Sequence, residues 1–489
     1  MESSKNLQVS ISFEEGPWQD ARVYGLRGRE AISDLFEFEV DVALPADVEV
    51  DEWIHTGKTI TLGLEIPGRV GRPIRGIVDA VWDRLEATGS NRTCTIRVVP
   101  PARALGLVVT QEVFLDASVP DLIRLKLEAH GFEKETYDLR LQETYPAREI
   151  VVQFGESDLA FVRRLAEQAG IAFHLDAWGE HDKWVFSDHN AAFRAMEEPA
   201  DLRFHARGEH AGVFELVRAS RTVPGTFFVQ DYNHRTPLLD PTGQHTIDGD
   251  APGGVVEFGA HVKSPEEAKR LAKVRAEESH ARRVVFEGKS TVFELTAGRH
   301  FVLADHPRFG DGLELLVTEV THEATFPLQG EVARGEPRYE NRFTAIPREV
   351  PYRPARTTPR PKIHGVVTGV VQPGPKGEVG GVAKLTDDGR YIVQLHFDTA
   401  ERGQQRASHP IRMAQPFAGH GNGMHFPLLP GTEVIVAFAN GDPDRPVIVG
   451  ALPNAISPSP IVAEESHTHR IQSSKGVVME FGTTILGGT

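Results

Sequence analysis

The sequence predicts a mainly β, multidomain protein with an α/β insertion and a small closed barrel of the OB-fold type. At 489 residues, the chain is well beyond the roughly 250 to 300 at which a single core stops growing. Residues with β alternation lie on both sides of a segment that carries helix signals. After a proline-rich stretch, short strands recur at the spacing of a small barrel.

The first block, residues 1–105, reads as a β-barrel or sandwich. Its alternating runs cover residues 36–42, 59–65 and 93–99. Cys94 lies inside the last run, where we expect a small buried side chain rather than a reactive thiol.

The second segment, residues 106–200, is predicted to be an α/β insertion. One helix begins after Ser118 and ends at Gly131. A strand over residues 149–154 then leads into a second helix, which starts at Ser157 and ends at Gly170.

Residues 201–345 read as a second β block with a covering helix, because Ser264 begins a capping box with proline at the first helical position. The two blocks are similar in size, which would suit a duplicated barrel, although residue identities show no internal repeat. Residues 346–362 carry five prolines and are expected to form an extended linker at a domain boundary.

The OB-fold domain is assigned to residues 363–455. Its strands are expected at 365–371, 391–397, 433–438 and 447–449, the last following an Asn440-Gly441 turn. In the final segment, residues 456–489, alternation from Val477 to Phe481 predicts an edge strand that needs partners, which other chains could supply.

Charge and composition exclude some classes of function. The 53 basic and 69 acidic residues give a net charge of −16, which disfavours a nucleic-acid partner. No apolar run approaches the ~18 residues of a membrane span, and the N-terminal residues lack the apolar region of a secretory signal. A single cysteine permits no internal disulfide, so we expect assembly in a reducing cytoplasm.

Two stretches resemble VgrG proteins. Residues 145–165, with Glu167 and Gly170-Ile171, resemble the hub signature of that family, and Phe154 replaces a commoner tyrosine. Residues 412–427 and 431–450 resemble its OB-domain signature, with Phe417 in place of the usual tryptophan. The resemblance extends over nearly the whole chain.

The resemblance implies a structural role in a contractile injection machine of the type VI secretion kind. The two β blocks would be hub β-barrels, and the OB-fold domain would continue into a trimeric β-helix that starts within residues 456–489. The implied partners are two further copies of the chain, an Hcp-like hexameric tube protein, a PAAR-type tip cap, baseplate subunits and effectors. Target membranes would be punctured mechanically, and the protein would leave the cell through the machine itself. Family members continue beyond the length of this chain.

The residues expected to matter are therefore structural. For the hub insertion they are Arg148, Glu149, Glu156, Ser157 and Asp158. For the OB-fold domain they are Gln415, Pro416, Gly431, Asp442, Pro443, Asp444, Arg445 and Pro446. Replacing Asp444 or Arg445 by alanine is expected to lower the thermal stability of the barrel.

The segments that could suggest a cofactor or metal site have simpler structural explanations. The glycine-rich run at residues 419–423 does not lead from a strand into a helix, which favours an open loop over a phosphate site. The Asn440–Arg445 segment is better explained as a turn capped by its aspartates, with Arg445 paired to one of them, than as a calcium loop. We expect no enzyme and no cofactor.

His467 and His469 would share one strand face, and three copies around an axis would supply six nitrogen ligands for a metal. Two solvent-exposed histidines after a linker are the commoner case. Two other functions stay open: a spike with a cell-wall-degrading domain beyond Thr489, and an OB-fold nucleic-acid-binding protein.

Overall fold

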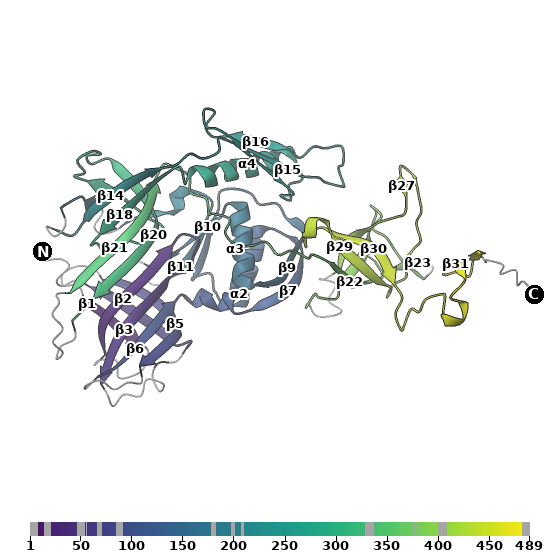
Figure 1. The fold of residues 1–489 in the computed structure, drawn as a ribbon, viewed down its shortest axis with the longest axis horizontal. Coiled ribbons are helices and arrows are strands. Elements are labelled where there is room, and N and C mark those ends of the chain that lie inside the picture. The colour runs from purple at the N-terminus through teal and green to yellow at the C-terminus, as the bar shows by residue number, and fades with distance from the viewer. Residues whose placement is uncertain are drawn as a thin grey trace, which may run out of the picture. The chain divides into compact units, whose positions relative to one another are not determined.

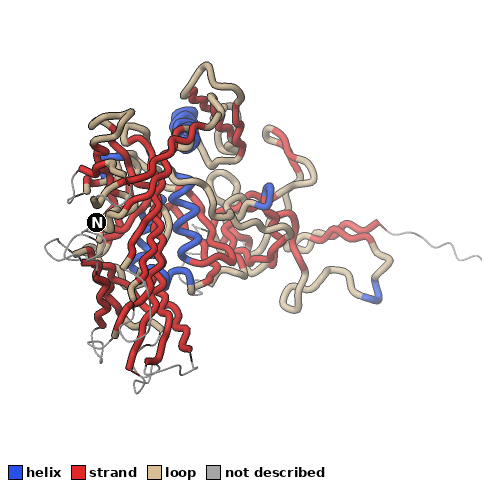
Figure 2. Tube along the Cα trace, turned by 60° about the vertical axis from the view of Figure 1, so that its left-hand side comes forward, coloured by secondary structure: helices blue, strands red, loops and turns tan. Residues whose placement is uncertain are grey.

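The computed structural model describes residues 8–13, 21–45, 54, 56–65, 71–84, 91–177, 182–196, 201–206, 210–327, 337–374, 377–379, 381–399 and 408–481. Strands far outnumber helices in the described chain, as the red and blue segments of Figure 2 show. Two compact units are present. Unit 1 comprises residues 1–108, 119–145 and 157–359, and unit 2 comprises residues 109–118, 146–156 and 360–489. The mainly β, multidomain fold class is confirmed.

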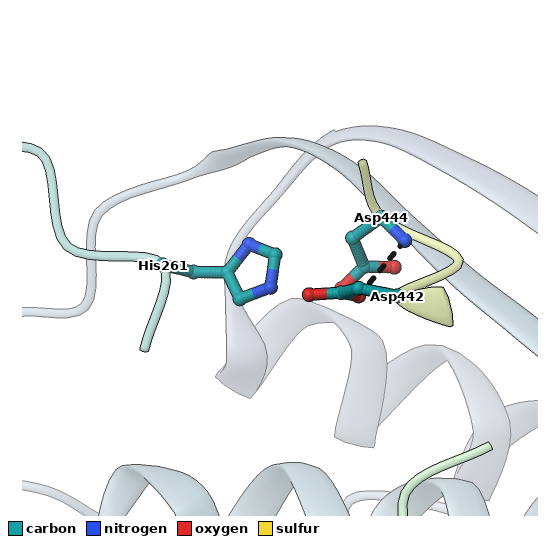
Figure 3. Close-up of side chains that lie close together, drawn as sticks. All are labelled: His261, Asp442 and Asp444. Atoms are coloured by element: carbon teal, nitrogen blue, oxygen red, sulfur yellow. Dashed lines mark hydrogen bonds between the residues drawn. The ribbon is translucent and has the colours of Figure 1, made fainter. Parts of the chain in front are cut away.

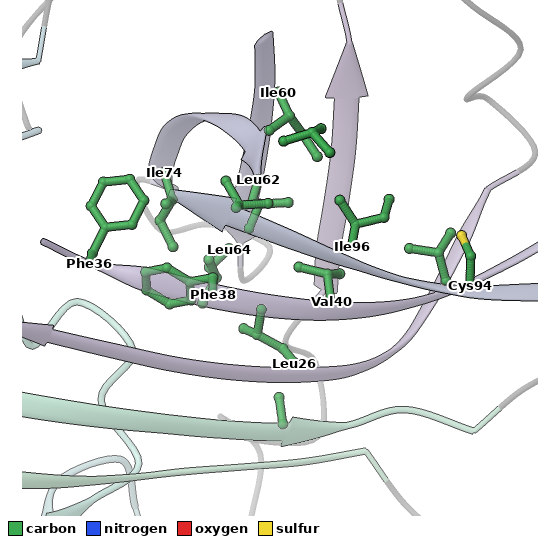
Figure 4. Close-up of a cluster of buried hydrophobic side chains, with 14 of the residues drawn as sticks. Leu26, Phe36, Phe38, Val40, Ile60, Leu62, Leu64, Ile74, Cys94 and Ile96 are labelled. Atoms are coloured by element: carbon green, nitrogen blue, oxygen red, sulfur yellow. The ribbon is translucent and has the colours of Figure 1, made fainter. Parts of the chain in front are cut away.

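The first half of unit 1 is a run of antiparallel strands in the order β1-β4-β5-β6-β3-β2. They are β1 Gln8–Phe13, β2 Arg22–Ala31, β3 Glu37–Pro45, β4 Thr59–Glu65, β5 Arg72–Arg84 and β6 Asn91–Val99. Every second residue of β4 is fully buried, as the alternation predicts. These strands enclose one core, whose members include Phe38, Ile96 and the buried Cys94 (Figure 4). The predicted burial of Cys94 is confirmed.

The second half of unit 1 continues the same sheet in the order β2-β20-β21-β18-β14. Strand β19 branches off this path: it pairs with β20 and also with the short strands β12 and β13. Its strands are β12 Arg194–Ala195, β13 Asp201–Arg203, β14 Val213–Ser220, β18 Val284–Ser290, β19 Arg299–Ala304, β20 Leu313–Thr325 and β21 Arg338–Pro347. A second core forms here around Phe286, Phe301 and Phe343. The two predicted β blocks are therefore joined along the β2–β20 seam into one 13-stranded sheet. Figure 1 shows β2, β20 and β21 of this sheet side by side.

Both halves use the same glycine–phenylalanine pairing. Gly28 on β2 lies directly opposite Phe38 on β3, and a Cβ added to Gly28 would come within 2.1 Å of that ring. Gly288 on β18 lies opposite Phe343 on β21, where an added Cβ would come within 2.3 Å of the ring. Each phenylalanine thus fills the space of a missing side chain, a known way of supporting a strand glycine.

The helices of the insertion begin and end close to the predicted residues. Helix α2 spans Val119–Ala129, and α3 spans Asp158–Ala169 with Ser157 as its N-cap and Gly170 in the left-handed conformation after it. The sheet β10-β11-β8 lies in the same segment, with β8 Tyr137–Arg140, β10 Ala172–Asp176 and β11 Lys183–Ser187. Short 3-10 turns occur at Pro101–Gly106 and Asn190–Ala192.

The predicted covering helix is α4, Pro265–His280, and its N-cap Ser264 accepts a hydrogen bond from the Glu267 amide. It packs on a separate sheet of order β16-β15-β17, as Figures 1 and 2 show. These strands are β15 Thr226–Gln230, β16 Gly243–Thr246 and β17 Gly254–Phe258. Ala268 and Ala272 of the helix share a small core with Val229 of the sheet.

Unit 2 contains a closed barrel of β22, β25, β26, β30 and β29. Their bounds are β22 Val366–Val371, β25 Tyr391–Leu395, β26 Ser408–Met413, β29 Glu433–Phe438 and β30 Pro446–Leu452. The closed barrel is confirmed, although β26 was not predicted. A two-stranded ribbon of β7 Val109–Ala117 and β9 Arg148–Ser157 adds Val113, Ile150 and Val152 to the barrel core. The insertion therefore contributes the β7–β9 ribbon to unit 2, and its helices and the sheet β10-β11-β8 to unit 1.

Short elements complete unit 2. They are β23 Glu378–Val379, β24 Val382–Ala383, β27 Ala418–Gly419, β28 Asn422–Gly423, the 3-10 turns Ala439–Gly441 and Ala463–Glu465, β31 His469–Gln472 and β32 Val478–Phe481. The expected C-terminal edge strand is β32, and it pairs with β31 of the same chain rather than standing without a neighbour. Ile471 and Phe481 remain about half exposed.

Candidate functional site

The aspartates of the OB signature lie in the loop between β29 and β30. The Asp444 amide donates a hydrogen bond to the Asp442 carboxylate at 3.1 Å (Figure 3). Arg445 lies 3.4 Å from the same carboxylate, and Arg360 donates to Asp442 at 3.0 Å. Asn440 and Gly441 both have positive φ, of 57° and 72°. The predicted turn, its cap by Asp442 and the Arg445 ion pair are therefore present.

Asp444 has a different role from the predicted local cap. Its carboxylate accepts a hydrogen bond of 2.7 Å from the Val152 amide on β9, and Arg360 lies 3.4 Å from its other oxygen. Only 2% of the side chain is exposed. A buried carboxylate that accepts a backbone amide and faces a guanidinium is satisfied by charge-assisted hydrogen bonds. Asp444 therefore fastens the β7–β9 ribbon to the barrel loop.

Glu149 makes a second fastening between the ribbon and the barrel. Its carboxylate pairs with the largely buried Arg390 at 2.6 Å, and Arg390 also contacts Asp388 at 2.8 Å. The Thr386 hydroxyl and the Arg390 guanidinium together lower the pKa of Asp388 to about 2. Glu149 and Asp444 thus hold β9 to the barrel at two points.

The remaining OB residues have backbone or packing roles. The Gly431 amide donates to the Val371 carbonyl from a left-handed conformation of φ 85°. Pro443 is buried in the loop, and Pro446 begins β30 opposite Phe438. The Gln415 amide contacts His425 at 3.4 Å, while Pro416 is exposed. On the ribbon, Arg148 begins β9, and the Glu156 carbonyl accepts a hydrogen bond from Gln153.

The hub signature continues into unit 1 at Ser157 and Asp158. The Ser157 hydroxyl accepts a hydrogen bond from the Ala160 amide and caps α3. Asp158 is buried beside the helix start, 2.8 Å from Lys126 and 2.8 Å from His130, which belongs to the segment after α2. Lys126 is also buried. The ion pair of Lys126 with Asp158 therefore compensates two charges, each of which would destabilise the fold if it were buried alone. Asp158 therefore ties α3 to α2.

A buried polar network along the β2–β20 seam was not predicted. Glu30 accepts hydrogen bonds from Arg72 at 2.6 Å and from His322 Nε2 at 3.0 Å. Because an ionised carboxylate can only accept, His322 carries its proton on Nε2, and Nδ1 accepts from the Tyr339 hydroxyl at 2.7 Å. Asn341 then donates to the Tyr339 oxygen at 3.0 Å. Every hydrogen bond in this network fits a neutral imidazole of His322.

The pKa directions agree with that assignment. Burial lowers the pKa of His322 and outweighs the hydrogen bond to Glu30, which acts in the opposite direction. Burial would raise the pKa of Glu30, but Arg72 and His322 keep it below its usual value. No local sequence pattern marks these residues, since they come from strands far apart along the chain.

The proline-rich linker was predicted as an extended segment, and residues 348–359 form a strap bound to unit 1. Arg353 pairs with Glu277 at 2.7 Å and donates to the carbonyls of Gly170 and Asp188 at 3.0 and 2.6 Å. Further on, the Thr358 hydroxyl and amide both donate to Glu167. The strap has no helix or strand, as its composition predicts, yet its side chains and backbone are held in place.

The histidines considered for a metal site are both exposed. His469 is the first residue of β31, whereas His467 lies in the turn before it. The expectation that both share one strand face is therefore wrong in the described chain. Within this turn the Thr468 amide donates a hydrogen bond to the Glu465 carbonyl.

A cavity of about 760 Å³ lies in unit 1. Its lining arginines already have acidic partners. Arg163 and Arg29 both pair with Asp34 at 2.9 Å, and Arg103 pairs with Asp79 at 3.2 Å. These ion pairs account for the arginines that line the cavity as structural contacts. No helix in the described part of the chain is long and apolar enough to cross a membrane.

Comparison with known families gives a direct assignment. The profile of the phage tail baseplate hub (GPD) family matches residues 29–328, more than half of the chain. The chain belongs to the phage tail baseplate hub family. A second profile, that of the type VI secretion system/phage-baseplate injector OB domain, matches residues 376–452 of this hub protein.

Curated relatives confirm the resemblance to VgrG proteins. The hub protein is 30% identical to the type VI secretion system spike protein VgrG4b of Pseudomonas aeruginosa, over 96% of the chain and 59% of the relative. It is 28% identical to spike protein VgrG3 of Vibrio cholerae, over 95% of the chain and 46% of the relative. A further Vibrio cholerae relative, 26% identical over 95% of the chain and 43% of its own length, is named an actin cross-linking toxin. The chain thus spans about half the length of these relatives.

Solved structures show the same fold. The Escherichia coli c3393 protein, described as a component of the type VI secretion system, has a TM-score of 0.65 at 24% identity, covering 91% of the hub protein and all of that chain. A chain in the structure of a PdpA–VgrG complex in its lidless form has a TM-score of 0.63 at 8% identity, covering 97% of the hub protein and 92% of that chain.

Proposed function

We propose that this chain is a non-catalytic hub and spike component of a contractile injection machine of the type VI secretion kind. In this proposal three copies assemble around an axis, dock on a hexameric tube protein of the Hcp kind and lie among baseplate subunits. The spike carries a PAAR-type cap and effectors and punctures target membranes mechanically. The protein leaves the cytoplasm through the machine.

The observation that carries the proposal is the order of the two family matches on one chain. A baseplate hub profile over residues 29–328 is followed by an injector OB-domain profile over residues 376–452. The fold supports a mechanical role, because one sheet runs through both halves of unit 1 and a closed barrel follows in unit 2. A hydrogen-bonded sheet resists deformation along its strands more than packed loops do.

The predicted signature residues support a structural role as well. Asp444, Glu149 and Asp158 each accept hydrogen bonds or ion pairs from groups of the same chain. Catalytic carboxylates need free access to a substrate atom within hydrogen-bond reach. These carboxylates hold elements together instead.

The absolute mass of the purified particle tests the proposal. Multi-angle light scattering at several concentrations should give about three times 53.9 kDa, and the particle should co-sediment with a purified hexameric tube protein. A monomer at every concentration that also fails to bind the tube would contradict the assembly. Incubation with purified peptidoglycan provides the control for activity, and release of muropeptides would overturn the non-catalytic assignment.

A further inference from the structure

The β2–β20 seam carries a titratable side chain at its middle. Among the described strands, β2 and β20 form the pair that joins the two halves of unit 1, with residues 25–31 of β2 opposite residues 319–325 of β20. His322 lies at the centre of this ladder, opposite Gly28, and its side chain is fully buried. A change of charge at His322 therefore acts directly on the contact between the two halves.

The hydrogen bonds of His322 are arranged for a neutral ring. Its Nδ1 accepts from the Tyr339 hydroxyl, so a proton added to Nδ1 would set two donors against each other. Asn341 hinders a rearrangement, because its amide nitrogen donates both to the Tyr339 oxygen at 3.0 Å and to the Val292 carbonyl at 2.7 Å. Turning this amide around to accept the Tyr339 proton would place its oxygen against the Val292 carbonyl oxygen. Protonation of the closed seam therefore breaks hydrogen bonds.

The surrounding charges do not favour a second buried cation. The charged and titratable groups that face His322 or its partner Tyr339 are Glu30 of β2, Arg72 of β5, Tyr339 of β21 and Glu294 of the segment after β18. Glu30 already pairs with Arg72 at 2.6 Å, and Glu294 acts on Tyr339 rather than on the imidazole. On the remaining side, the ring of Phe38 on β3 packs 5.6 Å from the imidazole. Glu30 would thus have to compensate two cations that water does not reach.

The cavity of about 760 Å³ lies over the same seam. Its lining includes residues 27–29 of β2 and 321–323 of β20, together with Leu159 and Arg163 of α3. Solvent can therefore approach the backbone of the Gly28–His322 pair, although the imidazole itself is buried. Backbone hydrogen bonds that lie next to solvent are the ones that open locally without unfolding of the whole domain.

We propose that the β2–β20 seam is an acid-operated latch, in which protonation of His322 opens the seam locally while the two cores of unit 1 stay folded. On opening, the imidazole is exposed to water and Nδ1 takes one proton from the solvent, and Glu30 keeps its ion pair with Arg72. On closing, the same proton returns to the solvent. All of these groups belong to one chain, so the latch goes beyond the proposed function and does not depend on it.

The size of the effect follows from proton linkage. An imidazole exposed in the open seam has the ordinary pKa of about 6.5, whereas the closed seam holds the ring neutral. Because the open form binds the proton, opening becomes more favourable as the pH falls below that value. Between pH 7 and pH 5 the equilibrium constant for opening is expected to rise about 25-fold.

Amide hydrogen exchange of the full chain, followed by mass spectrometry at pH 7 and pH 5, tests the latch. Each rate is divided by that of the unstructured chain at the same pH, which leaves the opening equilibrium. The protection of residues 25–31 and 319–325 should fall about 25-fold more in the unchanged chain than in His322→Gln. The glutamine amide can donate to Glu30 and accept from Tyr339, but it does not titrate.

Two comparisons separate the latch from a general effect of acid on unit 1. In β4, residues 59–65, the change with pH should be the same in His322→Gln and the unchanged chain, since these amides do not lie on the seam. The control His210→Gln replaces an exposed histidine of unit 1 and should keep the full pH response of the seam. An equal pH response of the seam in His322→Gln and the unchanged chain would overturn the proposal.

A second variant keeps the test decisive if His322→Gln does not fold. Tyr339→Phe removes the hydroxyl that opposes a proton on Nδ1, so the ring can be protonated while the seam stays closed. The loss of seam protection between pH 7 and pH 5 should then be smaller than in the unchanged chain. A loss of the same size in both proteins would show that His322 does not operate the seam.

Discussion

Asp444 connects elements that are far apart in the sequence, and its removal should show how much that connection contributes. The Asp444→Ala variant leaves the Val152 amide without its buried acceptor and removes one partner of Arg360. Losing a buried charged acceptor costs about 2–4 kcal/mol. We expect the free energy of unfolding of unit 2 to fall by that amount in denaturant titrations.

The controls separate this connection from a general effect of charge. Glu464→Ala removes an exposed carboxylate in the same unit and should change unfolding by less than about 0.5 kcal/mol. Arg445→Ala should have a smaller effect than Asp444→Ala, since Arg360 still contacts Asp442. Unchanged melting in both Asp444→Ala and Arg445→Ala would contradict the structural role of the loop.

At the scale of residues, the role of a side chain could be predicted where it depends on neighbours in the sequence. It could not be predicted where it depends on a partner far along the chain. Ser157 and Gly170 follow from capping chemistry, and both cap α3 as expected. Cys94 follows from alternation within one strand. The partner of Asp444 is 292 residues away, which no local spacing reveals. The loop motif identified an important aspartate without indicating what it holds.

At the scale of elements, the strap of residues 348–359 offers a sharp test. Arg353→Ala should leave Glu277 without its main partner and two carbonyls, of Gly170 and Asp188, without a donor. Since Arg353 and Glu277 are both nearly buried, we expect a loss of roughly 3 kcal/mol and local release of the strap. Limited digestion with proteinase K, read by mass spectrometry, should show faster cleavage within residues 348–362.

The matched control for the strap is Arg338→Ala, which removes an arginine whose side chain is 65% exposed beside Glu340. It should leave cleavage of the strap unchanged. Equal cleavage rates for Arg353→Ala and the unchanged chain would mean that the strap is held by its remaining contacts, including those of Thr358 with Glu167.

Elements with a clear period were predicted well. The alternation over residues 59–65 and 433–438 matches the bounds of β4 and β29. Strand β26 was missed, because Ser408–Met413 contains Pro410 and shows no clear alternation of its own. The proline-rich linker was identified as irregular from its composition. Its attachment through Arg353 and Thr358 depends on acidic residues of distant elements, which composition cannot show.

At the scale of the whole molecule, the sequence indicated two β blocks but not the seam that joins them. Strands β2 and β20 pair in register from Gly25–Thr325 to Ala31–Glu319, nearly 300 residues apart along the chain. Alternation tells which face of a strand is buried, whereas the choice of neighbour depends on the folded shape. The polar network of Glu30 and His322 lies on that seam and was missed for the same reason.

The two units are expected to differ in how their stability changes at acid pH. Within the described ranges, burial lowers the pKa of five histidines, and all of them belong to unit 1: His174, His280, His300, His306 and His322. A histidine whose folded pKa lies below its unfolded value of about 6.5 binds more protons in the unfolded state. Unit 1 is therefore expected to lose stability as the pH falls below about 6.5.

Calorimetry between pH 7 and pH 5 tests this expectation, and we expect two transitions of which that of unit 1 shifts more. Burial lowers the pKa of His174 to about 3, so protonation of the unfolded chain at pH 5 costs this unit about 2 kcal/mol. His174→Gln should reduce the difference in unfolding free energy between the two pH values by that amount, whereas His210→Gln, at an exposed position, should not. An equal pH dependence in His174→Gln and the unchanged chain would show that His174 does not stay neutral in the folded protein.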